Sequence, residues 1–352
     1  MPAGFSALDF YYILPELLLT GGAMMVLLLA VVTPRNDNLL LGVSLATLAG
    51  TLFAVFLFTG LDVTAARGLL AVDGFAAFFK VIVLLSAVLT ILMSAPYLRV
   101  EGLKAGEYYF LILCATLGMM FMASGVDLIT LFIGLETMAV SFYILAGYLK
   151  PNPRSNEAAV KYFLLGAFSL GVLLYGMSLL YGATGTTGLR GIATALSGQE
   201  PSLVLILAVV LIGAGMGFKI AAVPFHMWAP DVYEGAPTPV TAFLSVGSKA
   251  ASFAMLIRIF VEGLPAVSAD WTALFWVLAV ITMTLGNVAA LTQSNLKRML
   301  AYSSIAHAGY LLIGVTVATE RGVASLLVYL GVYLFMQLGA FAVVAAMRRS
   351  DV

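Results

Sequence analysis

The sequence has few of the side chains that bind metals or carry electrons. It contains one cysteine, Cys114, and two histidines, His226 and His307. Iron–sulfur clusters and structural zinc sites are held by sets of thiolates and imidazoles that this chain does not supply. We therefore expect no metal site and no bound redox cofactor in this chain.

Charged residues are also scarce. They make up 10% of the chain, whereas 62% of the residues are hydrophobic, and the mean hydropathy is +1.08. Soluble domains carry about 25% charged and about 45–50% apolar residues, so this composition indicates a polytopic membrane protein. The 17 basic and 17 acidic residues cancel, so nothing in the charge balance favours nucleic acid as a partner.

Long apolar runs fill most of the sequence. About 20 apolar residues cross a bilayer as a helix, and we expect an all-α fold with about eleven such spans. Their predicted positions are 12–32, 39–59, 74–96, 107–124, 127–148, 160–182, 203–227, 238–260, 271–292, 299–318 and 323–347. The longest linker, "GATGTTGLRGIATALSGQEPS", has room for a short interfacial helix but not for a soluble domain.

Basic residues in the loops predict the orientation of these spans. Cytoplasmic loops carry an excess of Lys and Arg. Loops after even-numbered spans hold only Arg67, Arg190, Arg258 and Arg321. Loops after odd-numbered spans hold Arg35, Arg99, Lys104, Lys150, Arg154, Lys161, Lys297, Arg298, Arg348 and Arg349. We therefore expect a periplasmic N-terminus.

Three charged residues lie near the middle of predicted spans: Glu136, Lys219 and Lys249. A central charge costs about 2.5–3.5 kcal/mol on insertion scales and usually marks a functional site. A static Glu–Lys ion pair is one explanation, but two lysines facing one acid leave one lysine over. Desolvation and repulsion favour the neutral form of a buried lysine. We therefore favour a proton relay.

A helix break is predicted beside Lys219 in "GMGFKIAAVPFH". Pro224 has no N–H, so the carbonyl of Ile220 loses its helical partner. An interrupted helix inside the membrane is tolerated where it lines a cavity or is buried in protein. A kink that only improves packing is the alternative, and the adjacent lysine favours a functional break.

Two further groups extend this predicted relay. His307, in "MLAYSSIAHAGYLLIG", follows two serines by one helical turn, and imidazole titrates near neutral pH. His226 is either part of the path or an interfacial residue. Glu157 and Lys161 are spaced as an i,i+4 pair; they either stabilise a helix end or deliver protons from the cytoplasm.

Three other charged residues are assigned simpler roles. We interpret Glu16 as interfacial and Asp73 as a helix N-cap. Two roles remain open for Lys80: its side chain extends to the membrane surface, or it is a functional group.

The segments "LLGAFSLGVLLYGMSLLYGATGTTGL", "GMGFKIAAVPFHMWAPDVYEGAPTPVTAFLSVGSKAASFAMLIRIF" and "LGNVAALTQSNLKRMLAYSSIAHAGYLLIG" resemble a known family. It is the subunit N family, one of the antiporter-like membrane subunits of bacterial NADH:quinone oxidoreductase (respiratory complex I), which are homologous to Mrp-type cation/proton antiporters. The resemblance covers essentially the whole chain. It implies an inverted-repeat fold with a broken helix near Lys219. On this basis 1–106 holds three N-terminal helices, 107–262 is the first repeat, and 263–352 is an incomplete second repeat whose C-terminal part we expect outside this sequence.

The resemblance also implies a function. It identifies the chain as a proton-translocating membrane-arm subunit of the bacterial inner membrane. Its partners are other membrane-arm subunits and the lipid bilayer, and NADH, FMN, iron–sulfur clusters and quinone are expected on other subunits. By motif match, the implied proton-relay residues are Glu136, Lys219, Lys249, Glu157, Lys161 and His307.

Three alternatives remain open at this stage. One is the membrane subunit of a related hydrogenase or photosynthetic-type NDH complex, and another is a scaffold without transport. The third is an Mrp-type Na⁺/H⁺ antiporter subunit, although sodium favours carboxylate and carbonyl ligands and the central groups here are mainly lysines.

Overall fold

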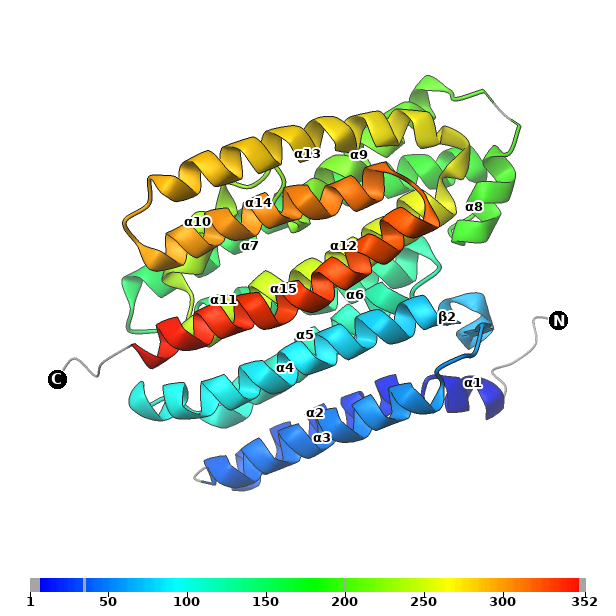
Figure 1. Cartoon of the computed structure of the whole chain (residues 1–352). Coiled ribbons are helices and arrows are strands. Elements are labelled where there is room, and N and C mark those ends of the chain that lie inside the picture. The colour runs from blue at the N-terminus through cyan, green and yellow to red at the C-terminus, as the bar shows by residue number, and fades with distance from the viewer. Residues whose placement is uncertain (1–6, 34–35, 199, 348–352) are drawn as a thin grey trace.

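The computed structural model describes residues 7–33, 36–198 and 200–347, so the predicted loop charges Arg35, Arg348 and Arg349 lie outside the described residues. Helices run side by side along one common direction (Figure 1). Ten of them are long and apolar enough to cross a membrane within the described part of the chain. They are α2 (Leu14–Val32), α3 (Asp37–Leu57), α4 (Gly74–Val100), α5 (Ala105–Ser124), α6 (Leu128–Ala146), α7 (Pro153–Thr184), the composite helix Thr238–Gly263, α13 (Ser268–Leu291), α14 (Leu296–Thr316) and α15 (Glu320–Ala346).

The remaining predicted span, 203–227, corresponds to the shorter helix α9 (Leu203–Lys219), which is followed by α10 (Trp228–Gly235). The predicted multi-span helical architecture is therefore confirmed. The composite helix, called the central helix below, consists of α11 (Thr238–Phe243), a π-helical turn (Leu244–Ser248), α12 (Lys249–Ile257) and a second π-helical turn (Arg258–Gly263). It contacts α4, α5, α9 and α15, and its apolar window is fully buried inside the protein.

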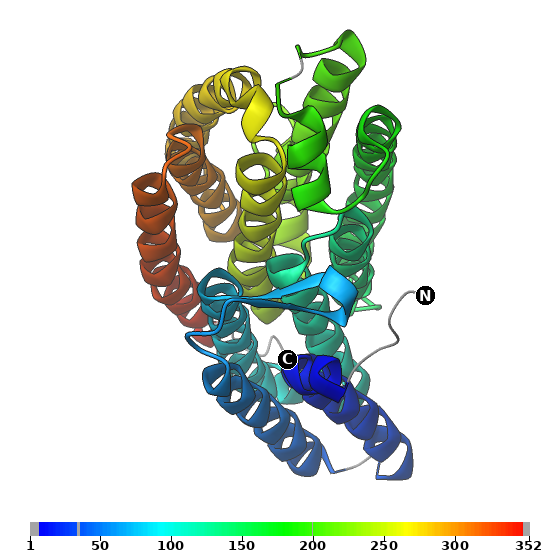
Figure 2. The same ribbon diagram turned by 90° about the vertical axis from the view of Figure 1, so that its right-hand side faces the viewer.

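The two ends of the bundle differ. At one end, called the hairpin end, β1 (Val63–Ala65) and β2 (Leu70–Val72) form an antiparallel pair joined by a left-handed turn at Arg67 and Gly68. The short helices α1 (Ala7–Tyr12) and α8 (Leu189–Leu196) lie at the same end, and Figure 2 shows the hairpin in front of the bundle. The other end, called the basic end, holds the loops 101–104, 147–152 and 292–295.

Sequence reasoning anticipated α8 but missed the hairpin, because three-residue strands are too short to show a periodic pattern. Backbone hydrogen bonds join the hairpin-end loops to one another. The Val126 N–H donates to the Leu69 carbonyl at 3.0 Å, and the Leu128 N–H donates to the Thr187 carbonyl at 2.9 Å. These bonds hold the loops of three different helix connections in one layer.

Side chains cap several helices at their N-termini. The predicted cap of α4 is confirmed, since the Asp73 carboxylate accepts from the Ala76 N–H at 2.7 Å. Asp127 caps α6 in the same way and also accepts from the Thr187 hydroxyl at 2.5 Å. Such caps satisfy backbone donors that the first helical turn leaves free, and they fix where α4 and α6 begin.

Small residues bring the buried helices close together. A Cβ on Gly118 of α5 would lie 2.5 Å from the Gly134 carbonyl oxygen of α6, and a Cβ on Gly286 of α13 would lie 2.6 Å from the Ala306 nitrogen of α14. Glycine at these points permits backbone contact, which is the usual basis of helix association in membranes. The close α5–α6 contact fixes the position of the helix that carries Glu136.

Candidate functional site

The break predicted beside Lys219 is present. Helix α9 ends at Lys219, and its end is closed by two hydrogen bonds: the Ala221 N–H donates to the Phe218 carbonyl at 3.0 Å and the Ala222 N–H to the Gly217 carbonyl at 2.8 Å. Ala221 has a φ of 58°. This is the left-handed conformation, and in this kind of helix ending the residue that adopts it is usually glycine. The structure therefore terminates the helix before Pro224, as the missing N–H of the proline requires.

Side chains from neighbouring elements cover the exposed backbone of the break. The indole N–H of Trp228 donates to the Phe218 carbonyl at 2.9 Å. The Val223 N–H donates to the Thr282 hydroxyl of α13 at 3.0 Å. These two contacts satisfy polar backbone groups that a bilayer cannot satisfy, so the break is built into the fold.

Lys219 is buried at this break without a hydrogen-bond partner or a contact ion pair. The residue is 4% exposed, and its Nζ has no hydrogen-bond partner in the structure. The Nζ lies 5.8 Å from the centre of the Tyr143 ring and 5.9 Å from that of Phe218. Because an unpaired buried charge is very unfavourable, this position suits a lysine that gains and loses a proton.

Glu136 lies on α6, half-buried, and interacts electrostatically with Lys219. The two groups form no direct ion pair: among the described residues, no carboxylate lies within 4.0 Å of Lys219 Nζ. Tyr143, two turns along α6 from Glu136, has a buried hydroxyl without a hydrogen-bond partner. The arrangement differs from a static Glu–Lys pair, because the acid and the base are neighbours that do not touch.

Lys249 occupies the middle of the central helix and is 3% exposed. It directly follows the π-helical turn Leu244–Ser248, a type of irregularity often found at functional sites. Its ammonium donates to the Ser304 hydroxyl at 2.6 Å and also to the Ser304 backbone carbonyl. Lys249 is thus held by α14, and the Tyr333 ring of α15 lies 5.8 Å from its Nζ.

His307 lies one turn beyond Ser304 on α14. Its Nδ1 hydrogen-bonds to the Tyr329 hydroxyl, and its ring centre lies 5.1 Å from that of Tyr333. The Tyr333 hydroxyl in turn donates to the Ser304 hydroxyl at 2.8 Å. The structure therefore brings Lys249 and His307 into one polar cluster of α12, α14 and α15.

The basic end carries an ion-pair network that contains Glu157 and Lys161. The Lys161 Nζ lies 2.7 Å from Glu157 Oε1, as the i,i+4 spacing indicated, and also 2.7 Å from Asp231 Oδ2. Arg298 reaches Asp231 at 2.8 Å and Glu234 at 3.0 Å. These groups border a cavity of about 180 Å³. Sequence reasoning found the first pair but missed the rest, because Asp231 and Arg298 are far apart in the chain.

The pKa of Asp231 reflects this network. Partial burial raises the pKa of its carboxyl, but the hydrogen bonds from Lys161 and Arg298 outweigh burial and hold the pKa below its usual value. Asp231 is thus kept ionised, and it links α10, just after the helix break, to α7 and α14.

Aromatic rings lie between this network and Lys219. Tyr162, adjacent to Lys161, stacks on Trp228 with ring centres 4.7 Å apart, and its ring centre is 4.8 Å from that of Tyr143. The predicted site residues therefore fall into three groups: Glu136 with Lys219, Lys249 with His307, and Glu157 with Lys161. The structure shows no direct contact between the groups, so side chains between them or solvent are needed to connect them.

Two interpretations from the sequence are wrong. Glu16 is not interfacial: it is 3% exposed, and its Oε1 lies 2.6 Å from the Nζ of Lys80, which is 5% exposed. Neither carboxylate oxygen of Glu16 has hydrogen-bond geometry, so the contact is ionic. Arg258 is not a loop charge: it is 3% exposed, and its guanidinium donates to both oxygens of Asp73 at 2.8 Å.

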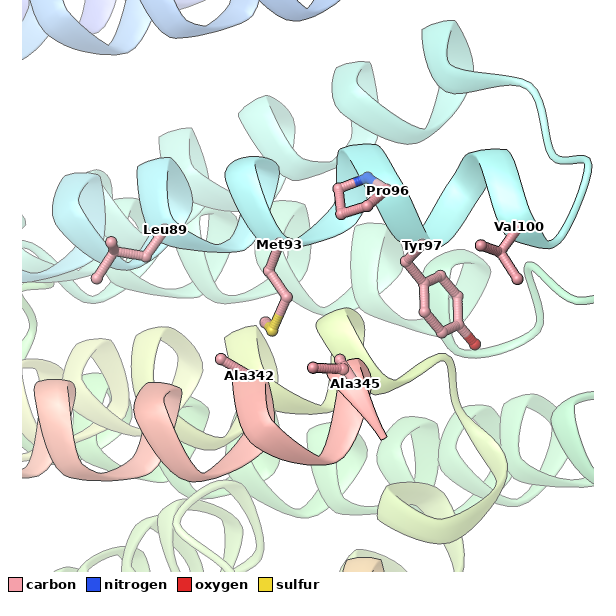
Figure 3. A pocket seen from close by; sticks show the side chains of 8 residues that line it. Leu89, Met93, Pro96, Tyr97, Val100, Ala342 and Ala345 are labelled. Carbon is pink, nitrogen blue, oxygen red and sulfur yellow. The ribbon is translucent and has the colours of Figure 1, made fainter. Parts of the chain in front are cut away.

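An apolar groove of about 530 Å³ lies between α4 and α15. Leu89, Met93 and Tyr97 of α4 face Ala342 and Ala345 of α15 across it (Figure 3). Its lining carries no charged residue, so it lacks the groups that proton transfer requires.

Buried lysines without a carboxylate partner, one of them at the end of an interrupted membrane helix, are typical of ion-translocating membrane proteins. The family described as NADH:quinone oxidoreductase/Mrp antiporter, transmembrane, matches residues 125–352. The NADH-quinone oxidoreductase subunit N of Trichlorobacter lovleyi is 49% identical over 343 residues, which is 97% of this chain and 70% of that relative. The subunit N 2 of Rhizobium meliloti is 47% identical over 96% of this chain and 70% of its own length.

A solved structure gives the same result. A chain of the respiratory complex I of Thermus thermophilus superposes with a TM-score of 0.78 at 35% identity, covering 94% of this chain and 70% of that chain. The chain belongs to the NADH-quinone oxidoreductase subunit N family, within the antiporter-like membrane subunits. It is accordingly a multi-pass membrane protein, and the resemblance seen in the sequence is confirmed.

Proposed function

We propose that this subunit carries protons along an axis of Glu136, Lys219, Lys249 and His307. The observation that supports this most is the ammonium of Lys219, which is buried at a helix break with no hydrogen-bond partner. A lysine kept for its permanent charge would need an ion pair or hydrogen bonds, whereas a lysine that alternates between charged and neutral forms does not. The redox reaction that drives the protons takes place on other subunits of the complex.

In this proposal protons enter at the basic end. Glu157 and Lys161 are 62% and 41% exposed in their side chains and border the charged cavity of that end. They pass protons toward Lys219 past Tyr143, whose buried hydroxyl is unpaired. The basic end then faces the cytoplasm and the N-terminus faces the periplasm of a bacterial inner membrane, as the distribution of Lys and Arg favours.

The proposal also assigns the parts of the chain. Residues 107–262 form the first antiporter-like repeat, because they contain the broken helix and both central lysines. Residues 1–106 are the N-terminal helices, and 263–352 begin the second repeat. NADH, FMN, iron–sulfur clusters and quinone are bound by other subunits, and the chain itself performs no redox catalysis.

The first test is NADH-driven proton pumping by the assembled complex in membrane vesicles. We expect Lys219→Met and Lys219→Arg to abolish the contribution of this subunit, because methionine carries no proton and arginine does not release one. Lys150→Met, which removes an exposed lysine of a basic-end loop, is the matched control and should pump normally. Wild-type pumping by Lys219→Arg would mean that only the positive charge matters, and the relay would be wrong.

Sodium transport is the second candidate function. The axis offers ammonium groups rather than the anionic oxygens that sodium prefers, so we expect pumping to be unchanged when choline replaces sodium in the same vesicles. A loss of pumping in choline would instead favour sodium as the transported ion.

A further inference from the structure

Ser304 is the point where four elements of the site meet. Its hydroxyl accepts a hydrogen bond from Lys249 of the central helix at 2.6 Å and one from Tyr333 of α15 at 2.8 Å. It also lies 3.4 Å from the Tyr233 hydroxyl of α10. Ser304 is 1% exposed and Tyr333 is 1% exposed, so these contacts are made away from bulk water. A serine that only packed α14 against its neighbours would not need three polar partners.

From this geometry we infer that the Ser304 hydroxyl is a relay position between Lys249 and the His307 side of the axis, with the Tyr333 hydroxyl as its second partner. The inference rests on the proposed proton-carrying function. It adds two residues that bear no charge and that the motif comparison does not single out.

A hydroxyl is suited to this position because it serves both forms of the lysine. When Lys249 is charged, its ammonium donates to Ser304 Oγ. When Lys249 is neutral, its lone pair accepts the Ser304 O–H, since hydroxyl hydrogens rotate to suit their partners. The Tyr333 hydroxyl donates to Ser304 Oγ in either case. Lys249 therefore keeps Ser304 as a hydrogen-bond partner in both protonation states, whereas an unpaired buried amine would cost about 1–3 kcal/mol.

The cluster continues from Tyr333 in two directions. The His307 ring centre lies 5.1 Å from that of Tyr333, and His307 Nδ1 hydrogen-bonds to Tyr329, one turn earlier on α15. Gln337, one turn later on α15, is 1% exposed, and its Nε2 has no hydrogen-bond partner. The buried face of α15 thus presents polar groups on consecutive turns beside Lys249 and His307.

The test compares Ser304→Ala, Tyr333→Phe and their double variant in the assembled complex in membrane vesicles. Ser304→Ala keeps the backbone carbonyl that also binds Lys249, so it removes only the hydroxyl. We expect each single variant to lower NADH-driven proton uptake per assembled complex about tenfold, which corresponds to about 1.4 kcal/mol on the barrier. Because the two hydroxyls act in series, the double variant should be no slower than the slower single variant.

Two controls separate this role from a structural one. Ser303→Ala changes the adjacent serine of α14 and should pump normally, and Ser304→Thr restores a hydroxyl and should recover most of the pumping. The inference is overturned if Ser304→Ala lowers only the amount of assembled complex while pumping per complex is unchanged. Additive losses in the double variant would also contradict it.

The result is also distinct from a failure of the proposed function. If Lys219→Met pumps like the wild type, the proton axis itself is wrong. If Lys219→Met fails to pump while Ser304→Ala pumps normally, the axis stands and only the role of Ser304 is wrong.

Discussion

Glu136 on α6 and Lys219 at the end of α9 interact electrostatically without forming an ion pair. This separation matters because a direct buried pair is strongly stabilised against losing either partner. A proton held by either member of a contact pair would be difficult to move. With the two groups apart, each can change its charge while the other adjusts the energy of that change.

We expect Glu136→Gln to lower proton pumping by about tenfold or more while the complex still assembles. Glutamine keeps the size of the side chain but removes the negative charge that favours a proton on Lys219. Glu136→Asp, which retains the carboxylate, should recover part of the activity. Equal pumping by Glu136→Gln and wild type would show that the acid does not act on Lys219.

Acid should weaken the basic-end network through Asp231. Its folded-state pKa is held below the usual value by Lys161 and Arg298, and the pKa of an aspartate in an unfolded chain is about 3.9. The stability from these contacts is therefore fully present above about pH 4 and is lost as the pH falls through the lowered folded pKa. We expect Asp231→Asn to remove this component, measured as a flatter acid limb of thermal stability against pH. An unchanged acid limb in the variant would contradict the assignment.

Gly118→Ala should destabilise the packing of α5 against α6. The added Cβ would lie 2.5 Å from the Gly134 carbonyl oxygen and 2.5 Å from the Met138 nitrogen, both of them backbone atoms. Overpacking of this kind costs about 1–3 kcal/mol. Gly171→Ala in α7 is the matched control, because no atom lies within 4 Å of its added Cβ. In thermal unfolding of the purified complex, the transition temperature should be lower for Gly118→Ala and unchanged for Gly171→Ala.

The Glu16–Lys80 contact should behave as a buried ion pair. Lys80→Met leaves the Glu16 carboxylate buried without its partner, and losses of this kind cost about 3–5 kcal/mol. The double variant Glu16→Gln, Lys80→Met removes both charges and should recover most of that loss in thermal unfolding. If the double variant is no more stable than Lys80→Met, the two residues are not coupled.

Much of the architecture followed from local features of the sequence. The spans were visible as long apolar runs, and the break beside Lys219 followed from Pro224, because a missing N–H acts within one helical turn. The Asp73 cap and the Glu157–Lys161 pair also depend on contacts three or four residues apart. The central positions of Glu136, Lys219 and Lys249 could be predicted from their sequence distance to the span ends alone.

The contacts that organise the site depend on helix packing instead. Lys249 meets Ser304 across 55 positions of sequence, and Lys161 meets Asp231 across 70. No periodic pattern specifies which faces of two helices meet. The burial of Glu16 was missed for the same reason, since its position near a span end looks exposed until Lys80 is brought against it.

The central helix has a consequence for how this subunit responds to its surroundings. Its apolar window, which includes Lys249, is fully enclosed by protein, whereas α2, α3, α7 and α13 present many apolar side chains outward. In a bilayer, lipids would therefore contact the outer helices and not Lys249. A change of lipid or detergent will loosen the contacts of the outer helices before it alters the chemistry of Lys249, so subunit loss should precede loss of proton transfer in the complexes that remain intact.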